Sequence, residues 1–322
     1  MDISAIKALV ADELTATNTL ILDSISSSIP LAKEIADYIF DNGGKRIRPM
    51  LLLLVAKALK YNKKDQINLA AIVELLHTAT LLHDDVIDES EMRRNQPTAN
   101  TKWGNEASVL VGDLLYTKAF QLIADIDHSG LTKLLANSTS IIVEGEVLQL
   151  IHRHDASTDE KTYLDIIQRK TGELFAITSA AMPVYMNLSD EETKQLRDYG
   201  SNLGTAFQMI DDTLDYIADP EKTGKNLGDD LAEGKPTLPL IYLLNNGTGE
   251  EKKLVKHAIE NKGSDDLALI QKAIVESNAI QYTKEKAQHL ADAACENLKV
   301  LDDSDAKKAL IALAQYAVSR MQ

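Results

Sequence analysis

The stretch ELLHTATLLHDDVIDESEMRRNQPT, residues 74 to 98, determines the fold that we expect for this chain. Its apolar residues recur at helical spacing, and neither glycine nor proline interrupts them before Pro97, so the stretch predicts a buried helix. On such a helix Asp84 and Asp88 lie one turn apart on the same face. Paired carboxylates suit a hard cation such as Mg²⁺, which takes oxygen ligands and leaves part of its shell to substrate phosphates.

The same spacing of acids recurs in FQMIDDTLD, residues 207 to 215, with Asp211, Asp212 and Asp215. A single acidic helix face in an acidic protein is usually only a solvated surface. Here both copies lie within apolar helices, where unpaired carboxylates are costly. The repetition therefore favours two metal-binding faces over two solvated ones.

The composition predicts an all-α protein. Among 322 residues there are only 15 Gly and 7 Pro, which leaves little material for the turns of a β protein. No Pro/Ser-rich or low-complexity stretch marks a boundary, so we expect a single domain over residues 1–322. The formal net charge of −15 argues against a general nucleic-acid binder.

In so acidic a chain, two basic clusters require an explanation. Lys45, Arg46 and Arg48 follow a glycine pair and lie where an apolar helix begins, a position that favours anions. Arg93 and Arg94 are expected on a flexible loop after the first aspartate motif, where they can close over phosphates. Both clusters favour an anionic ligand such as diphosphate, although ordinary surface bases that balance nearby acids remain the alternative.

The sequence gives no sign of secretion or of a membrane span. Cys295, the single cysteine, cannot form an intrachain disulfide, and we expect it to be a small core residue of a late helix. The acidic, amphipathic start of the chain is unlike a signal peptide, and no apolar run reaches the roughly 18 residues that a bilayer requires. We therefore expect a cytoplasmic protein.

Three weaker patterns leave alternatives open. A helix over residues 159–181 is expected to carry Lys170 and Thr171 in its middle, which suits a phosphate oxygen but is also an ordinary surface pair. Glu144, Glu146 and Gln149 either line a cavity or face water. Glu74 and His77 form a Glu-x-x-His pair of the kind found in di-iron bundles, but the sequence has no second such pair.

Four motifs in order resemble the trans-prenyl diphosphate synthases, and the bacterial long-chain members most closely. They are GGKRIRP at 43–49, LLHDDVIDESEMRR at 81–94, FQMIDDTLD at 207–215 and GKNLGDDLAEGKPTLP at 224–239. The resemblance implies an isoprenoid synthase-type bundle of ten or more helices around a deep central cavity. It also implies a homodimer and three Mg²⁺ ions between the two aspartate motifs.

The resemblance also implies roles for individual residues. Asp84, Asp88 and Asp211 would ligate Mg²⁺, with Asp85, Asp212 and Asp215 as supporting acids and Asp215 as a further candidate ligand. The allylic diphosphate would be held by Arg93, Lys170, Thr171, Gln208, Lys225 and Lys235. Isopentenyl diphosphate would be held by Lys45, Arg48, His77 and Arg94. Gly172 stands where the family often has alanine, and the basic tail of shorter-chain members is reduced to Ser319-Arg320-Met321-Gln322.

The expected reaction is ionisation of an allylic diphosphate, in which metal ions and basic side chains meet the charge of the leaving group. Isopentenyl diphosphate then attacks the allylic cation, and loss of a proton leaves a chain one C5 unit longer. No covalent nucleophile is required, and His77 is expected to bind substrate. Asp84, Asp85, Asp88, Asp211, Asp212, Lys170 and Lys225 are the expected catalytic residues.

Product length is expected to depend on the residues along the first aspartate helix. Thr80 lies one turn before Asp84, Ala79 is its neighbour, and both are small, so the tunnel should continue past them. Phe120, Leu122 and Ile123 on the next helix are the expected floor. We expect an all-trans product near C40, octaprenyl diphosphate, for a quinone side chain, with C35 and C45 as alternatives.

Two other classes of protein are disfavoured by the motifs. A class I terpene cyclase usually lacks the second Asp motif and GGKRIRP, and a non-catalytic subunit tends to lose one Asp motif, whereas this chain has all of them.

Overall fold

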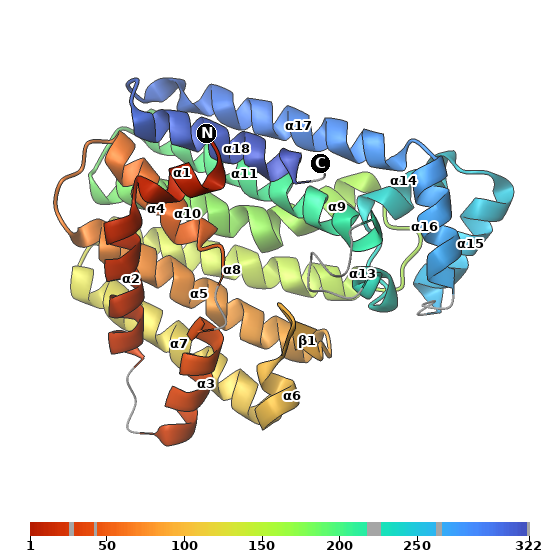
Figure 1. Ribbon diagram of the computed structural model, residues 1–322, viewed down its shortest axis with the longest axis horizontal. Coiled ribbons are helices and arrows are strands. Elements are labelled where there is room, and N and C mark those ends of the chain that lie inside the picture. The colour runs from red at the N-terminus through yellow and green to blue at the C-terminus, as the bar shows by residue number, and fades with distance from the viewer. Residues whose placement is uncertain (26–28, 42–43, 218–226, 262–265, 321–322) are drawn as a thin grey trace. The chain divides into compact units, whose positions relative to one another are not determined.

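The computed structural model describes residues 1–322 apart from 26–28, 42–43, 218–226, 262–265 and 321–322. More than ten helices make up nearly all of the described elements (Figure 1), which confirms the all-α prediction. The only strands in this part of the chain are β1 (Met92–Arg93) and β2 (Gln96–Pro97), which form a short antiparallel hairpin.

The chain divides into two compact units, each assembled from three separate stretches of sequence. Unit 1 comprises Met1–Ala136, Ile177–Arg197 and Asn297–Leu313. Unit 2 comprises Asn137–Ala176, Asp198–Glu296 and Ala314–Gln322. Neither unit is a continuous piece of the chain, and the expectation of one domain over residues 1–322 stays a prediction.

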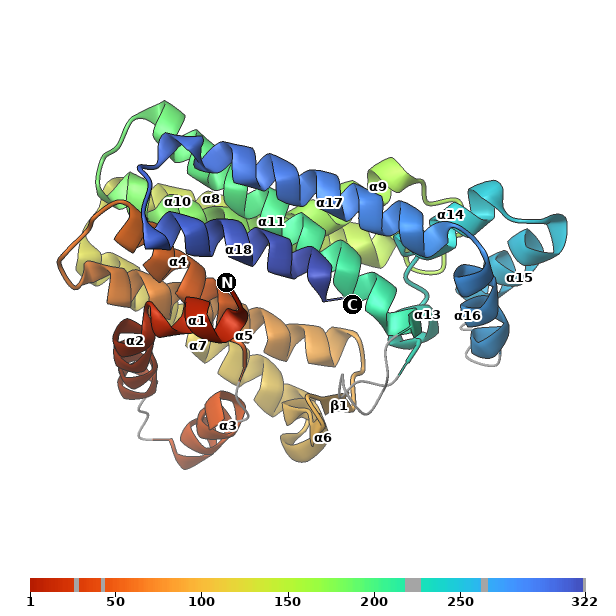
Figure 2. The ribbon, with the colours of Figure 1, turned by 45° about the horizontal axis from the view of Figure 1, so that its top comes forward.

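Unit 1 is built around α5 (Asp65–Ile87), which carries the first aspartate motif. This helix packs against α7 (Asn105–Ile126), α4 (Ile47–Ala58) and α2 (Ala11–Ser24), and Figure 2 shows it beside α7. Residues 69–76 of α5 are buried on every side, as their apolar run predicts. The unit also contains α1 (Ile3–Ala8), α3 (Pro30–Asp41) and α6 (Ala99–Trp103).

Unit 2 contains the second aspartate motif, on the C-terminal part of α11 (Asp190–Ile217). Tyr163 and Ile167 of α9 (Glu160–Ile167) pack there with Met209 and Ile210 of α11 in a hydrophobic cluster. The unit also contains α13 (Asp229–Ala232), α14 (Leu238–Asn246), α15 (Gly249–Glu260), α16 (Leu267–Glu276), most of α17 (Ala279–Asn297) and the end of α18 (Asp305–Ser319). In Figures 1 and 2, α17 and α18 lie side by side, and the Gln288 amide donates to Gln315 at 3.2 Å.

The single helix expected over residues 159–181 is instead three consecutive helical segments. A π-helical turn, η1 (Gln168–Gly172), separates α9 from α10 (Glu173–Tyr185) and contains Lys170 and Thr171. Such turns are rare, and they occur frequently at functional sites. Gly145 of α8 (Ser129–His152) lies against this turn, since a Cβ at Gly145 would be 2.8 Å from the backbone nitrogen of Lys170.

Two helices, α7 and α8, are long and apolar enough to cross a membrane by length and composition alone. Their most apolar windows have a mean hydropathy of 1.2, and 33% and 28% of these windows are buried. The exposed apolar residues include Val109 and Leu110 on α7 and Val143, Val147, Leu150 and Ile151 on α8. Both helices therefore present apolar side chains on the surface of the chain.

Candidate active site

The first aspartate motif lies at the C-terminal end of α5, and its three carboxylates are not equivalent. Asp84 and Asp88 are half-buried, whereas Asp85 is 4% exposed. Oδ1 of Asp85 accepts from Nε of Arg93 at 2.8 Å and lies 2.7 Å from Nη2 of the same guanidinium. Asp85 therefore fixes an arginine, and the two outer carboxylates are the more accessible acids of the motif.

The segment that carries Arg93 and Arg94 is the β1–β2 hairpin and not the flexible loop that we expected. Arg94 and Asn95 form its turn with φ values of 55° and 61°, as a type I′ turn requires. The Asn100 side-chain amide donates to the backbone carbonyls of Asp85 and Ser90, at 3.2 Å in each case. These bonds attach the start of α6, which follows the hairpin, to the end of α5, and the bond from Arg93 to Asp85 attaches the hairpin itself.

Basic side chains surround His77 in unit 1. Its Nε2 lies 2.9 Å from Nη1 of Arg48. Burial lowers the pKa of His77 well below its ordinary value, and the charges of Arg48, Arg94, Arg93 and Arg46 lower it further. The ring is therefore neutral near pH 7, and its Nε2 accepts from Arg48.

Arg46 and Arg94 also belong to this basic group. Arg46 donates to Glu74 at 2.5 Å, so the Glu-x-x-His pair consists here of two side chains that contact arginines. The Arg94 guanidinium lies 3.0 Å from the place where a Cβ of Gly44 would be, which explains why glycine suits this position. Lys45 is exposed. The structure thus brings together Arg48, His77 and Arg94, three of the four residues expected to hold isopentenyl diphosphate.

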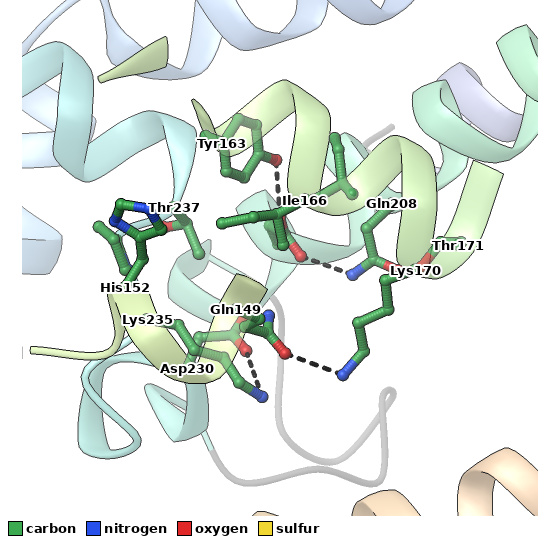
Figure 3. A pocket seen from close by; sticks show the side chains of 13 residues that line it. Gln149, His152, Tyr163, Ile166, Lys170, Thr171, Gln208, Asp230, Lys235 and Thr237 are labelled. Atoms are coloured by element: carbon green, nitrogen blue, oxygen red, sulfur yellow. Dashed lines mark hydrogen bonds and ion pairs between the residues drawn. The ribbon is translucent and has the colours of Figure 1, made fainter. Parts of the chain in front are cut away.

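A pocket in unit 2 contains four of the residues expected to hold the allylic diphosphate: Lys170, Thr171, Gln208 and Lys235 (Figure 3). It has a volume of about 70 Å³, and its wall includes Asp212 and Asp230. Arg93 of the same expected set lies in unit 1, and Lys225 lies outside the described residues. The two lysines come from the π turn and from the segment before α14, which are distant in sequence.

Acidic and amide groups hold both lysines of the pocket. Nζ of Lys170 donates to Glu146 at 2.6 Å and to Gln149 at 2.8 Å (Figure 3 shows the second bond). Lys235 is ion-paired with Glu233, and its Nζ lies 3.8 Å from Asp230. The sequence left open whether Glu144, Glu146 and Gln149 line a cavity or face water. In the structure Glu146 and Gln149 contact Lys170 of the pocket, whereas Glu144 pairs with Arg169.

The second aspartate motif repeats the spacing of the first with different partners. Asp211 pairs with Arg320 at 2.6 Å, and the Arg320 guanidinium lies 4.3 Å from the centre of the Phe207 ring. Oδ2 of Asp215 accepts from the backbone N–H of Asp230 at 3.1 Å. Asp211 and Asp215 are half-buried, as the outer acids of the first motif are.

The middle acid of this motif, Asp212, is 5% exposed and hydrogen-bonded through both of its oxygens. Oδ2 accepts from the Tyr163 hydroxyl at 2.6 Å, and Oδ1 accepts from the Gln208 amide at 2.7 Å. Burial raises the pKa of Asp212 to about 7, with a further contribution from the charge of Asp230. Tyr163 and Gln208 act in the opposite direction because they stabilise the charged form.

The donor chemistry of the motifs fits Mg²⁺ that is completed by a substrate. Among the described residues, no group of three or more His, Cys, Asp or Glu side chains lies close enough to hold a metal ion on its own. Each motif instead offers two half-buried outer carboxylates one turn apart. Mg²⁺ is commonly held by one or two carboxylates, several waters and substrate phosphates.

The residues expected to control product length lie in unit 1. Ala79 is fully buried, and Thr80 is half-buried with its hydroxyl donating to the carbonyl of His77 at 2.8 Å. On α7, Phe120 and Leu122 are half-buried and Ile123 is 2% exposed. Their role in product length stays a prediction.

Sequence reasoning missed Tyr163 and Arg320 as members of the site. Both contact the second aspartate motif from distant parts of the chain, and neither lies in a recognisable motif. It also placed Cys295 in the core, whereas the structure has it half-buried on α17, with its Sγ 3.8 Å from the Gln315 amide.

The chain matches the family model described as Polyprenyl synthetase over residues 29–277. It is 43% identical over 321 residues to the octaprenyl diphosphate synthase of Escherichia coli (strain K12), an alignment that covers 99% of each chain. A crystal structure of a decaprenyl diphosphate synthase from Rhodobacter capsulatus matches with a TM-score of 0.93 and 37% identity over 100% of both chains. A polyprenyl synthase from Caulobacter crescentus CB15, crystallised with calcium and isoprenyl diphosphate, matches with a TM-score of 0.96 and 38% identity over 100% of this chain and 98% of that one.

Proposed function

The chain belongs to the polyprenyl synthetase family and is a long-chain trans-prenyltransferase, and we propose that it makes all-trans octaprenyl diphosphate, the C40 product, for a quinone side chain. The relative from Escherichia coli, which carries that name, supports this length. The alternatives for the product are C35 and C45, and the similarity to a decaprenyl diphosphate synthase shows that similar chains differ in product length. Farnesyl diphosphate is the proposed primer.

The unit 2 pocket is the proposed site of the allylic diphosphate, and its residue set is the observation that carries the proposal. Lys170 and Lys235 supply positive charge, while Thr171 and Gln208 supply neutral hydrogen-bonding groups, all within one pocket. A diphosphate that enters takes over the lysine hydrogen bonds now made by Glu146 and Gln149. As the allylic C–O bond breaks, the lysines meet the growing negative charge of the leaving group. Lys225 and Arg93 are the other proposed contacts.

Isopentenyl diphosphate is proposed to bind at the basic group of unit 1. Arg48 and Arg94 can each donate to a phosphate, and Lys45 adds an exposed charge beside them. Neutral His77 contacts Arg48 at 2.9 Å and so positions it while also contacting the substrate. The proton lost at the end of each cycle is proposed to leave with the released diphosphate, which makes a base among these residues unnecessary.

Mg²⁺ is the proposed cofactor, with Asp84, Asp88, Asp211 and Asp215 as candidate ligands and three ions per site as the expected number. When bound, it supplies Lewis-acid stabilisation of the leaving diphosphate. Asp85 and Asp212 are proposed as supporting acids. The protein's own contribution is to hold the outer carboxylates at fixed spacing on α5 and α11.

Incubation of the purified chain with radiolabelled isopentenyl diphosphate and farnesyl diphosphate, with Mg²⁺ or with EDTA, tests this function. Sizing of the dephosphorylated products should show a metal-dependent ladder that ends near C40. A ladder ending at C35 or C45 would replace the proposed product. Absence of product with every allylic primer would favour a non-catalytic subunit, and a cyclised hydrocarbon would favour a terpene cyclase.

A second copy of the chain is the proposed cover for the exposed apolar residues on α7 and α8, in a cytoplasmic homodimer. Val143, Val147 and Ile151 recur at helical spacing on one face of α8, and Ile151 is 67% exposed. Light scattering after size exclusion should give twice the chain mass for the wild type and a shift toward monomer for Val147→Glu. Recovery of the chain in the membrane fraction would contradict this proposal.

The proposed tunnel is tested by replacing Phe120, Leu122 and Ile123 one at a time with Ala and sizing the products. A residue that closes the tunnel should yield longer chains when it is truncated. Unchanged product length in all three variants would remove the assignment. Thr80→Phe provides the opposite test, because a large side chain one turn before Asp84 should shorten the product.

A further inference from the structure

Tyr163 is a buried residue of α9 whose hydroxyl lies at the wall of the unit 2 pocket. Its ring packs in the hydrophobic cluster with Ile167, Met209 and Ile210, and only 4% of the residue is exposed. Its hydroxyl lies at the pocket wall and donates to Asp212 at 2.6 Å (Figure 3). The ring alone satisfies the packing, so the hydroxyl requires a separate explanation.

The bond from Tyr163 is the first of three consecutive hydrogen bonds along the pocket wall. The other oxygen of Asp212 accepts from Nε2 of Gln208 at 2.7 Å. Oε1 of Gln208 in turn accepts from the Thr171 hydroxyl at 2.9 Å. Together the bonds join α9, α11 and the π turn, and every member lines the same pocket.

Asp212 determines the orientation of the whole series. In its ionised form Asp212 only accepts, so the Gln208 amide turns its NH₂ group toward Asp212 and its oxygen toward Thr171. That oxygen takes the hydrogen of the Thr171 hydroxyl, so the second N–H of the Gln208 amide is the donor that this series can offer to a diphosphate oxygen. A carboxylate held by one donor per oxygen has little freedom to rotate, and Tyr163 supplies one of the two donors.

We propose that Tyr163 is a positioning residue for the allylic substrate: through Asp212 it fixes the Gln208 amide so that its second N–H can donate at the diphosphate subsite. This inference rests on the proposed function of the pocket. Tyr163 touches no substrate in this arrangement and supplies no group to the reaction. Its removal should weaken binding of the allylic diphosphate and leave isopentenyl diphosphate, whose proposed site is in unit 1, unaffected.

The test compares Tyr163→Phe with Tyr282→Phe. Tyr282 is a matched control because its hydroxyl also donates to a carboxylate, Glu160, at 2.6 Å, but it does not line the pocket. In Tyr163→Phe, the KM for farnesyl diphosphate should rise about tenfold, as expected for loss of one hydrogen bond to a charged group. The KM for isopentenyl diphosphate should stay within about twofold, and Tyr282→Phe should leave both values within about twofold.

A second measurement tests whether Tyr163 acts on the substrate through the residues of this hydrogen-bonded series. In a Gln208→Leu background, adding Tyr163→Phe should change the KM for farnesyl diphosphate by less than about twofold, because residues of one network are not additive. Calorimetric titration with inorganic diphosphate and Mg²⁺ should show the same pattern in binding constants, without turnover.

The outcomes separate this inference from the proposed function. An active wild type with an unchanged Tyr163→Phe variant would overturn the positioning role. Equal increases in both KM values, or a full tenfold effect in the Gln208→Leu background, would overturn it as well and show a general structural role. A wild type that makes no product contradicts the proposed function, and the diphosphate titration then decides whether Tyr163 still acts on the pocket.

Discussion

The two aspartate motifs share one spacing, but their middle carboxylates are held by different chemistry. Asp85 of the first motif is bound by the Arg93 guanidinium, whereas Asp212 of the second is bound by a tyrosine hydroxyl and an amide. Both middle acids are almost fully buried, and the outer acids of both motifs are half-buried. The difference teaches that the acids of an Asp-Asp-x-x-Asp pattern have separate roles: the buried middle acid attaches the helix to its neighbours, and the outer pair is the one proposed to bind a cation.

The largest expected effect separates the outer acids from the rest of the protein. Asp84→Ala and Asp211→Ala should each lower turnover about 1,000-fold, since they remove a ligand from the metal that stabilises the leaving diphosphate. Melting temperature in EDTA should barely change for Asp84→Ala, because removing one acid from an acidic face relieves repulsion when no metal is bound. Asp211→Ala should be slightly destabilised in EDTA, because it also loses the ion pair with Arg320. Steady-state kinetics and thermal unfolding of both variants check this. An unfolded variant, or one as active as wild type, would contradict the assignment of the outer acids.

Loss of the contacts of a middle acid should instead lower the free energy of unfolding. Arg93→Gln leaves the buried Asp85 carboxylate without its cation and should lower the free energy of unfolding by about 2 kcal/mol. The value is moderated because 33% of the Arg93 side chain is exposed. Adding Asp85→Asn should restore most of the loss in urea titrations. If the double variant is no more stable than Arg93→Gln, the comparison between the motifs is wrong about what Arg93 does.

The arginines around the first motif should also produce a pH effect through His77. Its pKa is lowered by burial and by Arg48, Arg94, Arg93 and Arg46, while the unfolded chain has an ordinary histidine pKa of about 6.5. Below that pH the unfolded state takes up a proton and the folded state does not, so stability falls as pH falls. Relative to His77→Gln, the wild type should lose about 1 kcal/mol per pH unit below about 6.5 and show no trend above it. Urea titrations between pH 5 and 8 in EDTA measure this, and parallel curves would contradict it.

The sequence predicted the local parts of this site correctly, because helical spacing alone places Asp84 near Asp88 and Asp211 near Asp215. It could not predict the partners of the middle acids. Tyr163 lies 49 residues from Asp212, and the contact depends on how α9 packs against α11. It also missed the β1–β2 hairpin, because Arg94 and Asn95 lack the glycine that usually marks such a turn.

The π turn is another feature that the sequence could not predict. The segment around Lys170 has a helical sequence pattern, and a helix was predicted there correctly in outline. The extra residue in the turn is accommodated by contacts with other helices, such as the close approach of Gly145 to Lys170. No local pattern carries that information, since a π turn and an α turn bury the same kinds of side chain.

The smallest expected effect concerns Arg320, whose guanidinium pairs with an outer acid and not a middle one. In EDTA, Arg320→Gln should lower the free energy of unfolding by about 1 kcal/mol, because the variant loses a partly buried ion pair and the contact with Phe207. With Mg²⁺ and inorganic diphosphate, the difference from wild type should shrink, since a metal ion at Asp211 replaces the same interaction. Lys286→Gln, which breaks the remote pair with Glu160 at 2.8 Å, should show a loss that is independent of metal. Thermal unfolding under both conditions decides the question: a loss at Arg320 that is also independent of metal would mean that Asp211 serves the arginine and not the cation, and the outer acids of the two motifs would then differ as their middle acids do.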